Sequence, residues 1–119
     1  MRLALAAVVL SLCACADQSN APRSIAGADA ARGLAVVERV GCAACHQIPG
    51  VSWPVGTVGG SLDGFAERSL IAGRLPNQPD VLTRWLRDAP SLSPETGMPP
   101  IPITETEARD VAAYLYTLK

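Results

Sequence analysis

The sequence contains few aromatic residues, a single histidine and almost no excess charge. Aromatic side chains make up 4% of its 119 residues, and the formal net charge is −1 at neutral pH. Proteins that bind nucleic acid usually carry a strong excess of basic residues on one face. The balance of charges therefore argues against nucleic-acid binding. No nucleophile–base pair or carboxylate cluster indicates a small-molecule substrate.

Cysteine is equally scarce, and its four copies fall in two places. Cys13 and Cys15 lie in the apolar N-terminal segment, and Cys42 and Cys45 form a Cys-x-x-Cys pair. This distribution leaves no cysteine over for a disulfide framework. The single histidine, His46, directly follows the second pair.

The segment Cys42–His46 reads Cys-Ala-Ala-Cys-His, the pattern of covalent c-type haem attachment. Two thiols would form thioether bonds to the haem, and the adjacent imidazole would bind the iron. Half of a zinc site, a thioredoxin-like redox pair and a structural disulfide are the alternatives. A closed zinc site needs two further ligands, which are absent after His46. The redox pair would need a βαβ context, which the sequence does not show.

Met98 is the candidate for the second iron ligand. Apart from Met1 it is the only methionine, and it lies between Gly97 and two prolines. A thioether is a weak neutral ligand that favours ferrous iron, and a stiff loop lowers the entropy lost in holding it. Met98 could also fill a gap in the hydrophobic core. Because the haem motif lies upstream and no other neutral ligand follows, we expect ligation by His46 and Met98.

The first residues resemble an export signal. Arg2 is followed by an apolar stretch that is shorter than the 20 residues or so needed to span a bilayer. Cys15 could be the lipidated residue of a bacterial lipobox, or cleavage could follow Ala16. We expect residues 1–14 to be a signal peptide, 15–27 a flexible spacer and 28–119 one domain. The predicted location is the periplasmic side of a bacterial membrane, with a lipid anchor at Cys15.

The pattern of apolar residues predicts short helices joined by long loops, without a convincing strand. Residues 29–40 form the first predicted helix and 69–72 a short helical piece. A third helix opens at 77–79 and ends before Pro90, and a capping box at 104–107 begins the last. Residues 49–64 and 89–102 are predicted loops. The expected fold class is all-α, with three or four helices wrapped around one haem.

The sequence resembles class I cytochromes c of the small bacterial type associated with respiratory oxidases. The resemblance covers residues 28–118. It is carried by segments 42–46, 48–50, 75–79, 82–86, 97–99 and 108–115. It implies a class I cytochrome c fold around one haem c, bound covalently through Cys42 and Cys45.

The resemblance also implies roles for residues around the haem. Pro49 matches the proline whose carbonyl accepts the Nδ1–H of His46, and Trp85 matches an indole that donates to a haem propionate. Arg74 and Arg84 are candidates to pair with the propionates. The first and last helices would pack at Gly33 and Tyr114.

One segment departs from the family pattern. Residues 59–64 read Gly-Gly-Ser-Leu-Asp-Gly, where similar proteins often have Gly-Pro-x-Leu-x-Gly, so the usual proline is absent. We therefore expect this loop to be less constrained.

The expected function is one-electron transfer in a respiratory chain, without enzymatic activity. Redox proteins of the terminal oxidase or quinol:cytochrome c reductase type would be the partners. Two alternatives stay open. The protein could be a fixed subunit of a larger oxidoreductase complex, or it could be a haem enzyme or gas sensor with an open sixth position.

Overall fold

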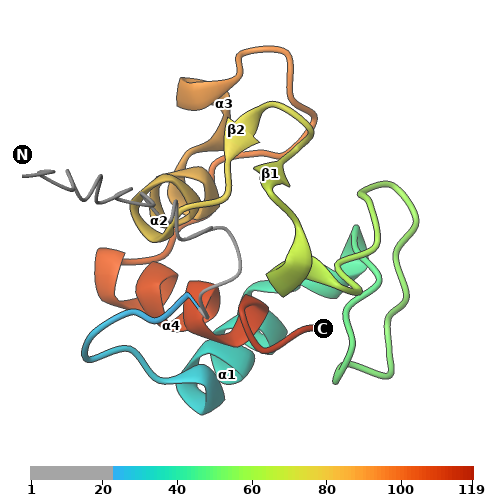
Figure 1. Ribbon diagram of the computed structural model, residues 1–119. Coiled ribbons are helices and arrows are strands. Elements are labelled where there is room, and N and C mark those ends of the chain that lie inside the picture. The colour runs from blue at the N-terminus through green and yellow to red at the C-terminus, as the bar shows by residue number, and fades with distance from the viewer. Residues whose placement is uncertain (1–22) are drawn as a thin grey trace, which may run out of the picture.

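The computed structural model describes residues 23–119, and two crossed helices form its base (Figure 1). These are α1 (Ala30–Val40) and α4 (Glu105–Leu115), with α2 (Pro79–Arg87) packed against α4. The predicted signal peptide with Cys13, and most of the predicted spacer with Cys15, lie outside the described residues. No helix in the described part of the chain is long and apolar enough to cross a membrane.

A glycine allows α1 and α4 to approach closely. Gly33 lies directly on the backbone of α4, where a Cβ would overlap the Asp110 carbonyl oxygen and come within 2.9 Å of the Val111 nitrogen. The expected glycine contact between the two helices is confirmed. It falls at Asp110 and Val111, one turn before Tyr114.

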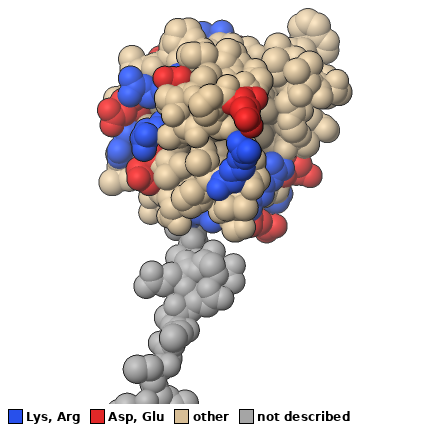
Figure 2. Space-filling model, turned by 90° about the horizontal axis from the view of Figure 1, so that it is seen from above, with Lys and Arg blue, Asp and Glu red and all other residues tan. Residues whose placement is uncertain are grey.

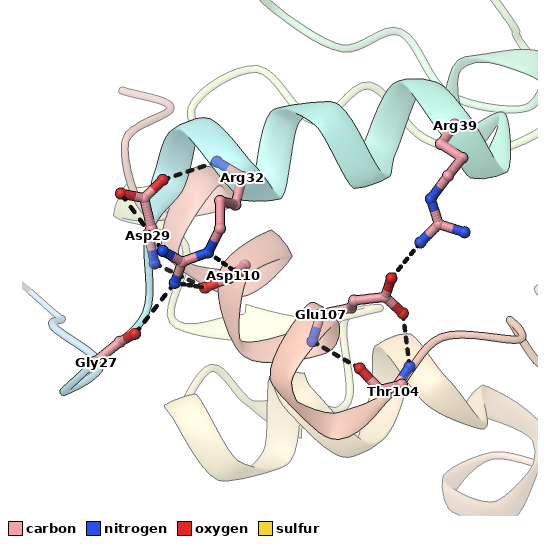
Figure 3. A network of polar contacts seen from close by, with 7 residues as sticks. All are labelled: Gly27, Asp29, Arg32, Arg39, Thr104, Glu107 and Asp110. Carbon is pink, nitrogen blue, oxygen red and sulfur yellow. Dashed lines mark hydrogen bonds and ion pairs between the residues drawn. The ribbon is translucent and has the colours of Figure 1, made fainter.

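Asp110 joins the two helices by hydrogen bonds, as Figure 3 shows. Its side chain is 5% exposed, and it accepts bonds from the Asp29 backbone N–H at 2.7 Å and from Arg32 Nε at 2.8 Å. Arg39 and Glu107 form a second ion pair between the same helices. The Arg32 side chain holds the pKa of Asp110 below its usual value, because its hydrogen bonds favour the carboxylate.

The helix ends agree with the sequence signals. Asp29 caps α1 at its N-terminus, and Gly41 ends the helix with a φ of +77°, which glycine adopts without strain. Pro79 occupies the first turn of α2. The Thr104–Glu107 capping box opens α4 with both of its hydrogen bonds formed.

Two predictions about the short elements were wrong. The expected helical piece at 69–72 is instead a small antiparallel hairpin of β1 (Leu70–Ile71) and β2 (Leu75–Pro76). Ala72 and Gly73 both have positive φ in the connecting turn, which a helix cannot contain. The predicted loop 89–102 begins with a short helix, α3 (Ala89–Leu92), because Pro90 starts this helix after α2 has ended.

Two single turns of 3-10 helix complete the described elements, η2 (Cys42–Ala44) and η3 (Phe65–Glu67). The predicted loop 49–64 contains neither helix nor strand. One hydrophobic core lies among α1, α2 and α4, and residues of the connecting segments such as Ile48, Phe65 and Ile103 belong to it. A buried polar pair stands inside: the Tyr116 hydroxyl donates to the Asn77 side chain, which donates in turn to the Phe65 and Arg68 carbonyls.

Candidate functional site

The Cys-Ala-Ala-Cys-His segment forms one tight turn directly after α1. Gly41 ends the helix, and the backbone N–H groups of Cys45 and His46 both donate to the Cys42 carbonyl, at 3.2 and 3.0 Å. The two thiols and the imidazole therefore come from a single turn of backbone.

The thiols are free, and they differ in their surroundings. Cys42 is partly buried against the core, and burial raises the pKa of its thiol, whereas Cys45 is exposed. Cys42 and Cys45 form no disulfide in the structure, and residues 23–119 contain no group of three or more His, Cys, Asp or Glu side chains that could hold a metal ion. The two short strands pair antiparallel, so the described residues contain no βαβ unit for a thioredoxin-like pair either.

The His46 ring lies against two glycines. Its Nδ1 is 2.7 Å from the Gly60 carbonyl oxygen, and a Cβ on Gly59 would come within 2.6 Å of Nδ1 and 2.8 Å of Nε2. A carbonyl can only accept, so Nδ1 must carry the proton, and Nε2 keeps the lone pair that a metal needs. A bond of this kind fixes the ring and strengthens the imidazole as a ligand.

The expected role of Pro49 requires correction. Its carbonyl accepts a hydrogen bond from the Tyr114 hydroxyl, while Gly60 is the partner of His46 Nδ1. Gly60 occupies the place of the proline that the family pattern usually has there. The Gly-Gly pair at 59–60, where the family pattern has Gly-Pro, is the sequence signal that marks this acceptor.

Tyr114 is a second residue whose contact the sequence did not reveal. Besides donating to the Pro49 carbonyl, its hydroxyl lies so close to Gly50 that a Cβ there would overlap it. Tyr114 thus fastens the segment that follows His46 to helix α4. Tyrosine in the apolar stripe of a helix predicts burial, but it does not indicate which carbonyl its hydroxyl will reach.

Met98 and Trp85 both contact the hydrophobic core. Met98 is partly buried in the loop after α3, and its backbone N–H donates to the Thr96 hydroxyl at 3.2 Å. Trp85 on α2 is 7% exposed, and its indole N–H donates to no other described residue. No buried side-chain nitrogen or oxygen of the described residues lacks a hydrogen-bond partner, so this N–H reaches solvent, where a carboxylate could accept from it.

Arg74 and Arg84, the candidates to pair with the haem propionates, have the following surroundings. Arg74 donates to the Ser93 hydroxyl at 3.3 Å and pairs with Glu95 at 3.6 Å. Arg84 is exposed and lines a surface hollow with residues 24–26 and Arg109, a hollow that includes none of the cysteines, His46 or Met98. Arg74 thus has polar partners of its own, and the pairing of Arg74 or Arg84 with a propionate stays a prediction.

The donor set fits a covalently bound haem. Two free thiols lie in one turn, and the neighbouring imidazole has its Nδ1 proton engaged and its Nε2 available. The backbone at Gly59 lies so close to the ring that a side chain there would fill the same space. Cys42 and Met98 pack against the same core, which contains Trp85.

Comparison with known proteins agrees with this arrangement. The family model described as "Cytochrome c" matches residues 30–119. The chain is also 37% identical over 89 residues to a protein named cytochrome c oxidase subunit 2 from Alkalihalophilus pseudofirmus. That match covers 74% of this chain and 25% of the relative, so the chain spans about a quarter of the length of the relative it matches.

Proposed function

The chain belongs to the cytochrome c family, and from this we propose that it is a one-electron carrier with His46 and Met98 as the axial ligands of its iron. Cytochromes c carry haem c bound covalently through cysteines, and the matched region contains Cys42 and Cys45. When bound, the haem supplies the one-electron chemistry by changing between its ferric and ferrous states. We therefore propose residues 28–119 as a monohaem domain.

The contact between His46 and Gly60 is the observation that carries this proposal. It engages Nδ1 and directs the remaining lone pair of the ring to Nε2. Gly59 excludes any side chain from the space around the ring. The chain thus holds an imidazole in one tautomer and one orientation beside two thiols, which is what a fixed proximal ligand requires.

Met98 is proposed to close the sixth position. Its loop is braced by the hydrogen bond to Thr96 and by two prolines that follow. A thioether raises the reduction potential, because it favours the ferrous state. With both axial positions filled, the site would exclude oxygen and peroxide and would only exchange electrons.

Trp85 is proposed to donate to a haem propionate. Its indole N–H has no acceptor among the described residues, and the ring stands nearly buried in the core. A propionate would satisfy this donor and orient the cofactor.

We also propose a respiratory role on the exported side of a bacterial membrane. The relative named as an oxidase subunit supports a partner of the terminal oxidase type, with a quinol:cytochrome c reductase as the complementary donor. The export signal at residues 1–14 and lipid attachment at Cys15 remain part of this proposal. Mass spectrometry of the mature N-terminus tests them directly.

Absorption spectra of the oxidised and reduced protein test the ligand assignment. A far-red sulfur-to-iron charge-transfer band should appear in the ferric protein and should vanish in Met98→Ala. Replacing the exposed Val58 by alanine should leave the band unchanged. A wild-type protein without the band that binds carbon monoxide readily when reduced would instead be a haem enzyme or a gas sensor.

A second candidate is a fixed subunit of an oxidoreductase complex. It is favoured by the length relation, because the matched segment makes up only 25% of the relative, whose name describes an oxidase subunit. Membranes solubilised in mild detergent distinguish the two cases. Co-migration of the haem with a large complex indicates a fixed subunit, while release of the haem protein as a monomer indicates a shuttle.

A further inference from the structure

The segment of residues 93–98, here called the Met98 loop, has few polar contacts with the rest of the protein. Its own hydrogen bonds are local. The Ser93 N–H donates to the Ala89 carbonyl at 2.9 Å, and the Thr96 N–H donates to the Ser93 carbonyl at 3.0 Å. Within residues 23–119, Arg74 is the only residue outside 89–98 that makes a polar contact with this loop.

Arg74 reaches two residues of the Met98 loop. One guanidinium nitrogen donates to Ser93 Oγ at 3.3 Å, and another lies 3.6 Å from a carboxylate oxygen of Glu95. Ser93 is 8% exposed, and Arg74 is the only described partner of its hydroxyl. Glu95 is the only charged residue from position 89 to position 104. Figure 2 looks onto the end of the molecule where α3 and the hairpin lie in Figure 1, and most of this surface is tan.

The hairpin gives these contacts a fixed support. The Arg74 N–H donates to the Ile71 carbonyl at 3.0 Å, and the Ile71 side chain is 2% exposed. Directly after the hairpin, the buried Asn77 side chain donates to the Phe65 and Arg68 carbonyls. The backbone at Arg74 is therefore attached to the core, so its guanidinium can restrain the loop.

A series of hydrogen bonds connects Arg74 to Met98. Arg74 donates to the Ser93 hydroxyl, and the Ser93 carbonyl accepts from the Thr96 N–H. The Thr96 hydroxyl accepts in turn from the Met98 N–H at 3.2 Å. A segment with few contacts opens locally at a small cost in free energy. Loss of the Arg74 contacts should therefore let the Met98 loop open more often.

We propose that Arg74 is a positioning residue that holds the Met98 loop in place and slows the departure of Met98 from the iron. The proposal rests on the proposed ligation of the iron by Met98. The contact with Ser93 should matter more than the contact with Glu95. A hydrogen bond from a charged donor to a buried hydroxyl is worth more than an ion pair between side chains that are 63% and 83% exposed.

The binding of free imidazole to the ferric, haem-loaded protein tests this role. Imidazole can enter only when the thioether has left, so at saturating imidazole the far-red sulfur-to-iron band disappears at the rate of Met98 departure. Arg74→Gln removes both contacts, and Ser93→Ala removes only the buried acceptor. Arg39→Gln is the matched control, because Arg39 also forms an ion pair between two elements, with Glu107, away from the Met98 loop.

All three variants should show the wild-type band before imidazole is added. In Arg74→Gln the band should then disappear about fivefold faster than in the wild type, which is the effect of one net hydrogen bond. Ser93→Ala should be about threefold faster, because it keeps the contact with Glu95. Arg39→Gln should lower the midpoint of denaturant unfolding and leave the imidazole rate unchanged.

Unchanged imidazole rates in Arg74→Gln and Ser93→Ala would overturn the positioning role while leaving ligation by Met98 intact. A lower reduction potential in Arg74→Gln, with an unchanged rate, would reassign Arg74 to a haem propionate. An equal acceleration in Arg39→Gln would overturn the proposal by attributing the effect to general loss of stability. A wild-type protein without the far-red band would overturn ligation by Met98 and the role of Arg74 together.

Discussion

Replacing Gly33 by alanine tests whether the close crossing of α1 and α4 holds the fold together. Two effects of opposite sign compete at this position. Alanine favours a helix over glycine by about 1 kcal/mol, so the substitution would stabilise an isolated α1. In the folded protein the new Cβ would lie 2.5 Å from the Asp110 carbonyl carbon, well inside the 3.4 Å at which ordinary contact begins.

The steric effect should prevail. The groups that obstruct the new Cβ are the Asp110 carbonyl and the Val111 nitrogen, which both belong to the backbone of α4. No side-chain rotation can therefore make room, and the two helices must move apart. Overpacking of this kind costs about 1–3 kcal/mol and occasionally more. Separation would also lengthen the hydrogen bonds from Asp29 and Arg32 to Asp110. Because the overlap is with backbone, we take the upper end of that cost, about 3 kcal/mol, and subtract the gain of about 1 kcal/mol in helix propensity. We therefore expect Gly33→Ala to lower the free energy of unfolding by about 2 kcal/mol, or the Tm by roughly 8–16 °C.

Denaturant and thermal unfolding of the haem-loaded protein, followed by far-UV circular dichroism, measure this difference. Ala35→Gly is the matched control, because Ala35 is exposed on the same helix. It should cost about 1 kcal/mol through helix propensity alone. If Gly33→Ala proves as stable as the wild type or more so, the inferred contact between α1 and α4 is wrong.

Three further predictions follow from the polar contacts. Gly60→Pro should stabilise the protein by about 0.4–1 kcal/mol, because it restricts the unfolded chain; Gly60 donates no backbone hydrogen bond among the described residues and has open space at its Cβ. A loss of stability in chemical denaturation would refute it. The pKa of Asp110 is lowered by Arg32, so its contribution is present above pH 3.8 and disappears as the pH falls through the folded pKa. The stability difference between wild type and Asp110→Asn should therefore shrink in acid, and a constant difference would contradict this. Burial raises the pKa of Tyr116 to about 12, so its contribution is complete below pH 10 and is lost as the pH rises through about 12. Ultraviolet titration should show one late-ionising tyrosine that is absent in Tyr116→Phe, and an unchanged titration curve would refute the assignment.

Local signals in the sequence predicted the longer elements because those signals act over a few residues. Asp29 before an apolar stripe, Pro79 in a first turn and the Thr104–Glu107 capping box each satisfy backbone groups of their own helix. The hairpin at 70–76 was missed, since its two strands are only two residues long and too short for any periodicity. The turn between them depends on a positive φ at Ala72. Alanine rarely adopts this conformation, so its presence in the sequence does not predict such a turn.

The haem chemistry was readable from the sequence by itself. Two thiols and one imidazole in five consecutive residues determine the cofactor and its attachment, because the chemistry needs only neighbours along the chain. The elimination of other histidines and methionines left Met98 as the candidate opposite His46.

Only the tertiary structure decided which distant groups surround that motif. The acceptor for His46 is the Gly60 carbonyl, and the Pro49 carbonyl is taken by Tyr114, 65 residues further along the chain. Backbone carbonyls are chemically alike at every residue, so a sequence cannot show which one a ring or a hydroxyl will meet. The same holds for Arg74. Its charge marks it as a surface residue, but only the folded chain shows that its guanidinium lies against Ser93, 19 residues further along the chain.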